Sequence, residues 1–241
     1  MIEVKGLSVT YPDGTRALES ASFSVQEGER VALIGANGAG KSTLLMALVG
    51  VCEKAAGSVN IAGIELTKKN LPALRAHAGV VLQNPDDQLF CATVYDDVAF
   101  GPRNMGMDEA AVERRVATVL SDLGIEKLRD RMPHRLSGGE KRVAAIASVL
   151  SMRPSVMLFD EPTSFLDPRA RRHMAGLLSR LPHTMLIATH DLDMALEVCQ
   201  RVIVLKGGRL LSDGPARKLL TDGDLMDAAG LELPLSFGGY G

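Results

Sequence analysis

The stretch with the clearest chemical potential is GANGAGKST, residues 35–43. It fits the pattern G-x-x-x-x-G-K-[ST], follows a continuously apolar segment and opens a helical run, which is the context that identifies a P-loop. Its glycines permit tight turns whose N–H groups surround phosphate, Lys41 adds a positive charge, and Ser42 offers a hydroxyl to Mg²⁺. The predicted nucleotide-binding residues are Gly35, Ala36, Asn37, Gly38, Ala39, Gly40, Lys41, Ser42 and Thr43.

A second chemical signal is SVMLFDE, residues 155–161, where an apolar run ends in two adjacent carboxylates. Open α/β sheets place their ligands at such strand ends. Asp160 is positioned to help hold Mg²⁺, and Glu161 could orient or deprotonate an attacking water. The alternative is a pair of acids that simply ends a strand.

Three residues, Gln83, Asp160 and His190, are expected at one location by the same sheet rule. Gln83 and His190 each lie at or just beyond the end of an apolar run, as Asp160 does, so the sheet should bring them together near the nucleotide. Taken alone, His190 is more typical of a polar residue beside a helix, and Gln83 is uninformative. Asp167 precedes Pro168, a common first residue of helices, so it is either a plain N-cap or a functional residue.

The stretch HRLSGGEKR, residues 134–142, predicts a second anion site. Ser137 and Glu140 have the spacing of a capping box, which begins a helix. Gly138 and Gly139 would let a ligand approach the helix end, whose N–H groups and dipole attract anions. The sequence alone leaves open whether this end serves the P-loop nucleotide of the same chain or of another.

Strands alternating with helices must position these groups. Continuously apolar runs predict strands buried on both faces, and their alternation with helical patterns predicts a parallel α/β sheet. These runs are 30–35, 79–83, 155–161, 184–190 and 201–209. The alternating N-terminal segment, with 20–25 and 58–63, predicts a small antiparallel sheet.

The chain is predicted to be a single domain with an inserted part. Residues 87–150 lack strand signals and indicate a helical insertion, including a helix over 108–124 capped by Asp108. The β subdomain and the core would comprise 1–86 and 151–230. The remaining residues, 231–241, are expected to form a loose tail.

Composition narrows the class of protein. The 241 residues are 46% hydrophobic, with 27 basic and 29 acidic residues. No block of like charges suggests a nucleic-acid partner, and Arg169, Arg171 and Arg172 are expected on a solvated helix face. The three cysteines form neither a disulfide framework nor a metal knuckle. The sequence begins without an apolar signal core. We therefore expect a soluble or peripheral protein of a reducing cytosol.

In this order, the motifs resemble the ATP-binding-cassette (ABC) ATPases over nearly the whole chain. The resemblance rests on Tyr11 before the P-loop, Gln83, the LSGG of 136–139, the paired acids, the SFLD loop of 164–167 and His190. It implies an ATPase with a RecA-like P-loop NTPase core of α/β class, an N-terminal antiparallel β subdomain and an inserted helical subdomain.

The resemblance also implies roles for single residues. Tyr11 would stack on the adenine of ATP, and Ser42, Gln83 and Asp160 would hold Mg²⁺. Glu161, His190 and Gln83 would be catalytic, with His190 contacting the γ-phosphate. Family cassettes are similar in working as head-to-tail dimers, which implies that a second subunit supplies part of each site. The residues that would bind ATP in trans are Ser137, Gly138, Gly139 and Asp167.

Within the family, residues 80–90, 93–106 and 230–234 look like those of energy-coupling-factor ATPases, most closely the cobalt and nickel importer branch. This implies a peripheral subunit on the cytoplasmic face of the cell membrane, working with transmembrane subunits and a second cassette, here expected to be an identical copy. The alternatives are a soluble ABC ATPase without a transport role, a cassette of an ordinary ABC transporter, and a P-loop kinase.

The chain departs from the family pattern in its LSGG helix. Val143 stands where many relatives have Arg. Arg142 is adjacent but lies about 100° around the helix, so we do not expect it to substitute. Glu140 replaces a common Gln, which a capping box accepts, and Phe165 is bulkier than the usual residue in its loop.

Overall fold

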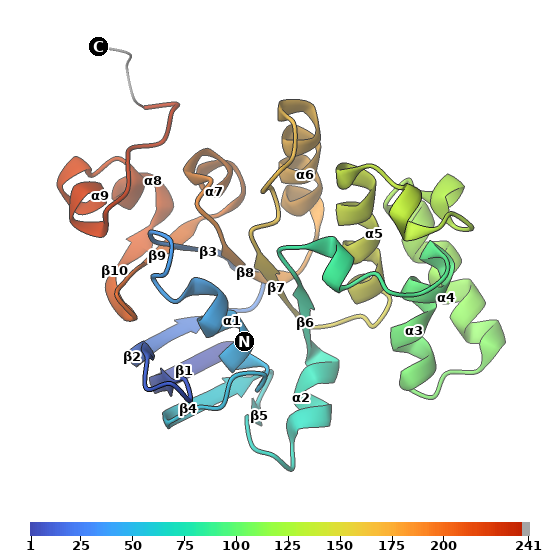
Figure 1. The fold of residues 1–241 in the computed structure, drawn as a ribbon, viewed down its shortest axis with the longest axis horizontal. Helices are drawn as coiled ribbons and strands as arrows, with labels where there is room; N and C mark the ends of the chain where they lie inside the picture. Colours follow the sequence, from blue (N-terminus) through green and yellow to red (C-terminus); the bar gives the residue numbers. More distant parts are fainter. Residues whose placement is uncertain (238–241) are drawn as a thin grey trace.

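The computed structural model describes residues 1–237, which form two β-sheets with helices packed around them (Figure 1). The smaller sheet has the order β2-β1-β4-β5, and all its pairings are antiparallel. Its strands are β1 (Ile2–Thr10), β2 (Arg16–Val25), β4 (Ala56–Ile61) and β5 (Ile64–Glu65). The predicted N-terminal antiparallel sheet is confirmed.

The larger sheet has the order β10-β9-β3-β8-β7-β6. Its pairings are parallel from β9 to β6, and only β10 runs antiparallel to its neighbour. Its strands are β3 (Arg30–Ile34), β6 (Ala78–Val81), β7 (Val156–Asp160), β8 (Thr184–Ala188), β9 (Arg201–Lys206) and β10 (Arg209–Pro215). The predicted α/β class with a parallel sheet is confirmed.

This sheet separates two hydrophobic cores, which explains the apolar runs. Side chains alternate across a strand. In β3, Ala32 and Ile34 belong to one core, and Val31 and Leu33 belong to the other. The strands β7 and β8 divide in the same way. Each central strand is therefore buried on both faces, so its polar groups can lie only at its ends.

Helices cover both faces of the sheet. Helix α1 (Lys41–Leu48) packs in the core that includes the antiparallel sheet, and α5, α6 and α7 pack in the other. The remaining helices and the 3₁₀ turns complete the described chain. The helices are α2 (Leu71–His77), α3 (Val94–Asn104), α4 (Glu109–Asp122), α5 (Gly138–Leu150), α6 (Pro168–Arg180), α7 (Leu192–Val198), α8 (Ala216–Leu220) and α9 (Gly223–Ala229); the 3₁₀ turns are η1 (Pro85–Asp87), η2 (Glu126–Leu128) and η3 (Pro133–Arg135).

The segment between β6 and β7 is helical, as predicted, and lies to one side of the sheet (Figure 1). Asp108 caps α4 by accepting the N–H of Ala111 at 2.8 Å. Buried Val112, Val116 and Leu120 line one face of that helix. Subdomain boundaries at 86/87 and 150/151 stay a prediction.

The described part of the expected loose tail, residues 231–237, contacts other parts of the chain, and its looseness stays a prediction. The N–H groups of Leu235 and Ser236 donate to the carboxylate of Asp193, each at 3.0 Å. The guanidinium of Arg217 lies 5.9 Å from the ring centroid of Phe237. These partners are distant in sequence, so local composition could not reveal them. The rest of the expected tail, 238–241, lies outside the described residues.

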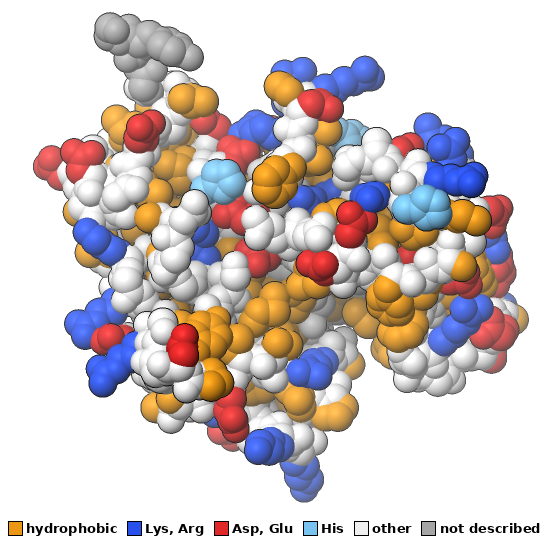
Figure 2. Space-filling model, in the orientation of Figure 1, with side chains coloured by type: hydrophobic (Ala, Val, Ile, Leu, Met, Phe, Trp, Pro, Cys, Tyr) orange, Lys and Arg blue, Asp and Glu red, His pale blue; other side chains and the backbone are white. Residues whose placement is uncertain are grey.

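Within residues 1–237, each helix is too short or too polar to cross a bilayer. Charges of both signs are intermingled on the face drawn in Figure 2, in keeping with a formal net charge of −2.

Gly79 of β6 is a sensitive packing position. A Cβ there would lie 2.2 Å from Val149 Cγ1 and 3.0 Å from Pro154 Cγ. We expect Gly79→Ala to lower the free energy of unfolding by about 1–3 kcal/mol, the usual cost of overpacking, as measured by urea denaturation. Gly223→Ala is the control, because its added methyl group meets no atom within 4 Å. Equal stability of the two variants would contradict the packing of β6 on α5.

Candidate nucleotide-binding and catalytic site

The P-loop connects β3 to α1 and lies against the backbone of two other strands. Gly35 and Gly40 have φ angles of 157° and 102°. A Cβ at Gly35 would lie 2.2 Å from the carbonyl oxygen of Leu205, and one at Gly40 would lie 2.6 Å from that of Ala17. Only glycine fits at both positions, so the loop is fixed between β9 and β2 by close backbone approach.

Lys41 is held inside the loop. Its side chain is buried, and its Nζ donates to the carbonyl oxygen of Gly35 at 2.7 Å and to that of Ala36 at 3.4 Å. The same Nζ lies 3.9 Å from Glu161 Oε1. Its positive charge is therefore directed at the space in front of the loop, where the phosphates of a nucleotide would lie.

Two of the three residues predicted to hold Mg²⁺, Ser42 and Asp160, are in contact, and the third, Gln83, lines the same cavity as Ser42. Ser42 Oγ donates to Asp160 Oδ1 at 3.0 Å, which joins the start of α1 to the end of β7. Burial raises the pKa of Asp160, and a bound cation would favour its charged form. A hydroxyl and a carboxylate are oxygen ligands of the kind that Mg²⁺ takes beside nucleotide phosphates. The residues therefore fit this ion.

Glu161 and His190 join the ends of β7 and β8. His190 Nδ1 lies 2.7 Å from Glu161 Oε2, which also accepts the backbone N–H of His190 at 3.2 Å. Glu161 is buried and has a φ of 48°, a backbone conformation that non-glycine residues rarely adopt. The N–H of Glu161 donates to the carbonyl oxygen of Ala188 at 2.8 Å, which stabilises this turn. The carboxylate thus has a fixed position beside Lys41.

Most of the residues predicted for the chain's own nucleotide site line a cavity of about 330 Å³. Tyr11 lies at it with its hydroxyl 2.8 Å from Thr43 Oγ1. Asp160 and His190 do not line it but bond to Ser42 and Glu161, which do. The lining residues are Tyr11, Thr15, Arg16, Ala17, Asn37, Gly38, Ala39, Gly40, Lys41, Ser42, Thr43, Gln83 and Glu161.

The predicted second anion site lies outside this cavity. The capping box at the start of α5 is present: Glu140 N–H donates to Ser137 Oγ at 3.3 Å, and the Glu140 carboxylate accepts the N–H of Ser137 at 2.9 Å. A Cβ at Gly138 would meet nothing within 4 Å, whereas one at Gly139 would lie 3.5 Å from Ala170 Cβ of α6. The beginnings of α5 and α6 are therefore neighbours on the surface.

Asp167 is an N-cap, as one of the two interpretations held. Its carboxylate accepts the N–H groups of Arg169 at 2.8 Å and Ala170 at 2.9 Å. Like residues 137–139, it does not line the cavity of its own chain. Phe165, two residues before it, is 94% exposed with a φ of 63°. The four residues predicted to act in trans thus lie together, apart from the P-loop.

Sequence reasoning missed two arginine contacts near the site, one half-buried at Arg171 and one buried at Arg142. The expectation of a solvated Arg171 is wrong, because it forms a bidentate pair with Asp191 at 2.6 and 2.7 Å. Burial alone would raise the pKa of Asp191, but the bonds from Arg171 and Met194 N–H hold it below its usual value. Arg142 points from α5 to the carbonyl oxygens of Leu82 and Ser164. No local pattern marks such partners.

Comparisons with known proteins bear on the family and the fold. The family model described as ABC transporter matches residues 18–164. A Geobacter sulfurreducens protein named as an ABC transporter ATP-binding protein is 51% identical over 99% of this chain and 96% of its own length. The energy-coupling factor transporter ATP-binding protein EcfA of Methanothermobacter thermautotrophicus is 46% identical over 97% of this chain and 77% of its own length. The structure of cbiO1 from Clostridium perfringens, described as part of the ABC transporter complex cbiONQ, superimposes with a TM-score of 0.83 at 38% identity, covering 94% of this chain and 93% of that one.

The position of Glu161 predicts a specific kinetic defect. Glu161→Gln removes the proton acceptor and keeps the shape, so we expect kcat for ATP hydrolysis to fall by roughly 10²- to 10⁴-fold, the range of a positioned general base. The Kd for a fluorescent ATP analogue should change little, because the P-loop contacts remain. The exposed Glu53 supplies a matched control, Glu53→Gln. Near-normal phosphate release by Glu161→Gln would reject the assignment.

Proposed function

The chain belongs to the ABC transporter family of ATPases, whose hydrolysis of ATP drives transport, and from this premise we propose that it powers an importer of the energy-coupling-factor type. The proposed mechanism of ATP hydrolysis rests on the Glu161–His190 pair, which lies beside Lys41. The importer type is supported by the EcfA relative, by the cbiO1 structure and by residues 80–90 and 93–106. The proposed cargo is Co²⁺ or Ni²⁺, carried by transmembrane subunits, with this chain peripheral on the cytoplasmic face.

In the proposed mechanism the P-loop N–H groups and Lys41 bind the β- and γ-phosphates of ATP, and Tyr11 stacks on the adenine. Ser42, Asp160 and Gln83 would hold Mg²⁺, which offsets phosphate charge. Glu161 accepts a proton from the attacking water, and His190, fixed by its contact with Glu161, contacts the γ-phosphate.

A second copy of the chain completes the proposed site. Ser137, Gly138 and Gly139 form an exposed helix beginning that does not line their own cavity, so an anion bound there would come from elsewhere. In a two-fold head-to-tail dimer this end faces the γ-phosphate of the other subunit. Asp167 and the exposed Phe165 lie on the same surface.

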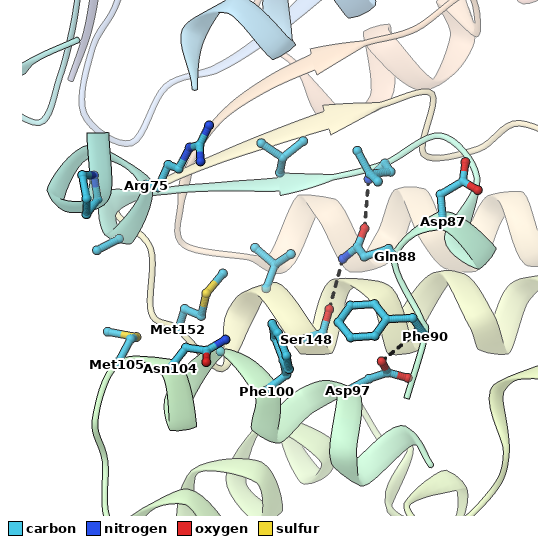
Figure 3. Close-up of a pocket in the computed structure, with 16 residues that line it drawn as sticks. Arg75, Asp87, Gln88, Phe90, Asp97, Phe100, Asn104, Met105, Ser148 and Met152 are labelled. Atoms are coloured by element: carbon cyan, nitrogen blue, oxygen red, sulfur yellow. Dashed lines mark hydrogen bonds between the residues drawn. The ribbon is translucent and has the colours of Figure 1, made fainter. Parts of the chain in front are cut away.

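A groove beside η1 is the proposed docking site for a membrane subunit (Figure 3). It has a volume of about 510 Å³, and Phe90 and Phe100 pack edge-to-face at 5.0 Å inside it while staying 65% and 46% exposed. Asp97 is 3% exposed and its Oδ2 has no hydrogen-bond partner among the described residues. The occupant should therefore be an apolar helical segment that also brings a hydrogen-bond donor.

The dimer is tested by mixing two broken subunits. Lys41→Ala disables the P-loop, and Gly138→Asp places a carboxylate at the other anion site without a clash. Each variant alone has two broken sites. In the mixed dimer one site has both defects and the other has none, so roughly a quarter of all sites recover after exchange, as measured by γ-phosphate capture. A mixture without intact sites, despite demonstrated subunit exchange, would refute action in trans.

The importer and its groove are tested in vesicles that hold the chain with its co-purified membrane subunits. We expect ATP-dependent uptake of Co²⁺ or Ni²⁺.

Asp87 lines the groove, whereas Asp86 pairs with Lys141 at 2.6 Å. We expect Asp87→Ala to weaken the complex by roughly tenfold, the effect of one charge-assisted hydrogen bond.

Asp86→Ala is the matched control and should keep the yield of the complex. Uptake of vitamins but of neither ion would contradict the proposed cargo while leaving the ATPase assignment intact. An unchanged complex in Asp87→Ala would contradict the docking site.

A further inference from the structure

Arg142 is a buried cation whose bonded partners are all backbone groups. It lies in α5 and is only 2% exposed. Its Nη1 donates to the carbonyl oxygen of Leu82 at 3.2 Å and to that of Gln83, and its Nη2 donates to that of Ser164 at 3.1 Å. Its Nε is buried without a partner among the described residues. Burial lowers the pKa of Arg142, against the opposing charges of Asp160 and Glu161.

If this arrangement served only to stabilise the fold, it would be unfavourable in free energy. A charged group loses its hydration on burial, and neutral carbonyl oxygens compensate it less well than a carboxylate does. An apolar side chain of similar size is often as stable in such a place. The planar guanidinium does, however, bond in fixed directions to several acceptors at once. Its geometry therefore fits a role in holding segments together.

The three carbonyl groups belong to the two segments that serve the reaction. Gln83 lines the nucleotide cavity. Ser164 follows Glu161 by three residues, and its hydroxyl donates to Glu161 Oε2 at 3.4 Å. Arg142 itself stands five residues after Ser137, on the helix whose beginning forms the second anion site. One side chain thus connects the segments that serve the nucleotide of its own chain with the helix that would serve the nucleotide of the second copy.

The helix turn explains why Arg142, and not residue 143, makes these contacts. Consecutive residues lie about 100° apart around a helix. Val143 is consequently buried in the hydrophobic core, whereas Arg142 faces the ends of β6 and β7. The offset from position 143 therefore turns Arg142 toward the active-site segments.

We propose that Arg142 is a positioning residue for ATP hydrolysis, which fixes the Gln83 segment and the loop after Glu161 relative to α5. A shift of α5 at the dimer surface then moves Gln83 and the 161–167 loop together. The inference rests on the proposed role of Glu161 and is independent of the cargo.

The test compares Arg142→Met and Arg142→Lys with Arg115→Met. Arg115 is a matched control in α4, because it also donates to a backbone carbonyl, that of Ser151 at 2.8 Å, away from the nucleotide cavity. For each variant we would measure the thermal midpoint, the Kd for a fluorescent ATP analogue and kcat.

We expect kcat of Arg142→Met to fall roughly 10- to 100-fold, the scale of a misplacement of about 1 Å. The Kd should stay within about threefold, because the P-loop is untouched. Arg142→Lys should recover part of kcat, because it keeps the charge without the planar fork. Arg115→Met should keep kcat within about twofold even if its midpoint falls as far.

A wild-type kcat in Arg142→Met would overturn the inference, as would an equal fall in Arg115→Met at a similar loss of stability. If Arg142→Met does not fold, Arg142→Lys decides: a lower kcat at unchanged Kd supports the role, and a wild-type kcat rejects it. The Glu161→Gln variant distinguishes a failure of the positioning role from a failure of the proposed role of Glu161. Full activity there would remove the premise, whereas a strong defect there with a wild-type Arg142→Met would refute the positioning role alone.

Discussion

The burial of the central strands on both faces is the constraint from which the site follows. Because β3, β7 and β8 contribute alternate side chains to two separate cores, their interiors hold no room for polar groups. The first polar residues appear where each strand ends, and parallel pairing brings those ends to one edge of the sheet. Lys41, Asp160 and the Glu161–His190 pair come together for this reason, although Lys41 precedes the other three by more than a hundred residues of sequence.

The closely spaced charges at this edge stabilise one another's positions. Lys41 is directed by the carbonyl oxygens of its own loop and by Glu161. Glu161 is in turn fixed by His190 and by a turn that requires a rare backbone conformation. Strain of this kind persists when surrounding contacts determine the backbone, and it is common at functional sites. In the proposed reaction this carboxylate would need little reorganisation, which is the condition for efficient electrostatic catalysis.

The sequence predicted the parts of this arrangement that depend on local pattern. The apolar runs identified the parallel strands, and the capping spacings identified the beginnings of α4, α5 and α6. Strand ends then predicted which polar residues should meet. Contacts between distant segments left no such trace: Arg171 with Asp191, the 232–237 segment on Asp193, and Arg142 with the carbonyl oxygens of two loops. Those contacts depend on how finished elements pack, and side-chain type alone does not specify a partner.

The nucleotide cavity and the groove share one short segment, which gives a physical reason why they should communicate. Gln83 lines the cavity, whereas Gln88 lines the groove. Gln88 accepts the N–H of Leu82 at 3.0 Å and donates to Ser148 Oγ of α5 at 3.1 Å (Figure 3). It also donates to the carbonyl oxygen of Ala145 at 2.8 Å, so these bonds close the segment on itself and tie it to α5. Arg142 holds the same segment one turn earlier on that helix. Because rigid packed elements move as units, a partner that shifts α5 from the groove would also shift Gln83, and a nucleotide that draws in Gln83 would reshape the groove. Binding at either place would then change affinity at the other by the same factor, as linkage requires.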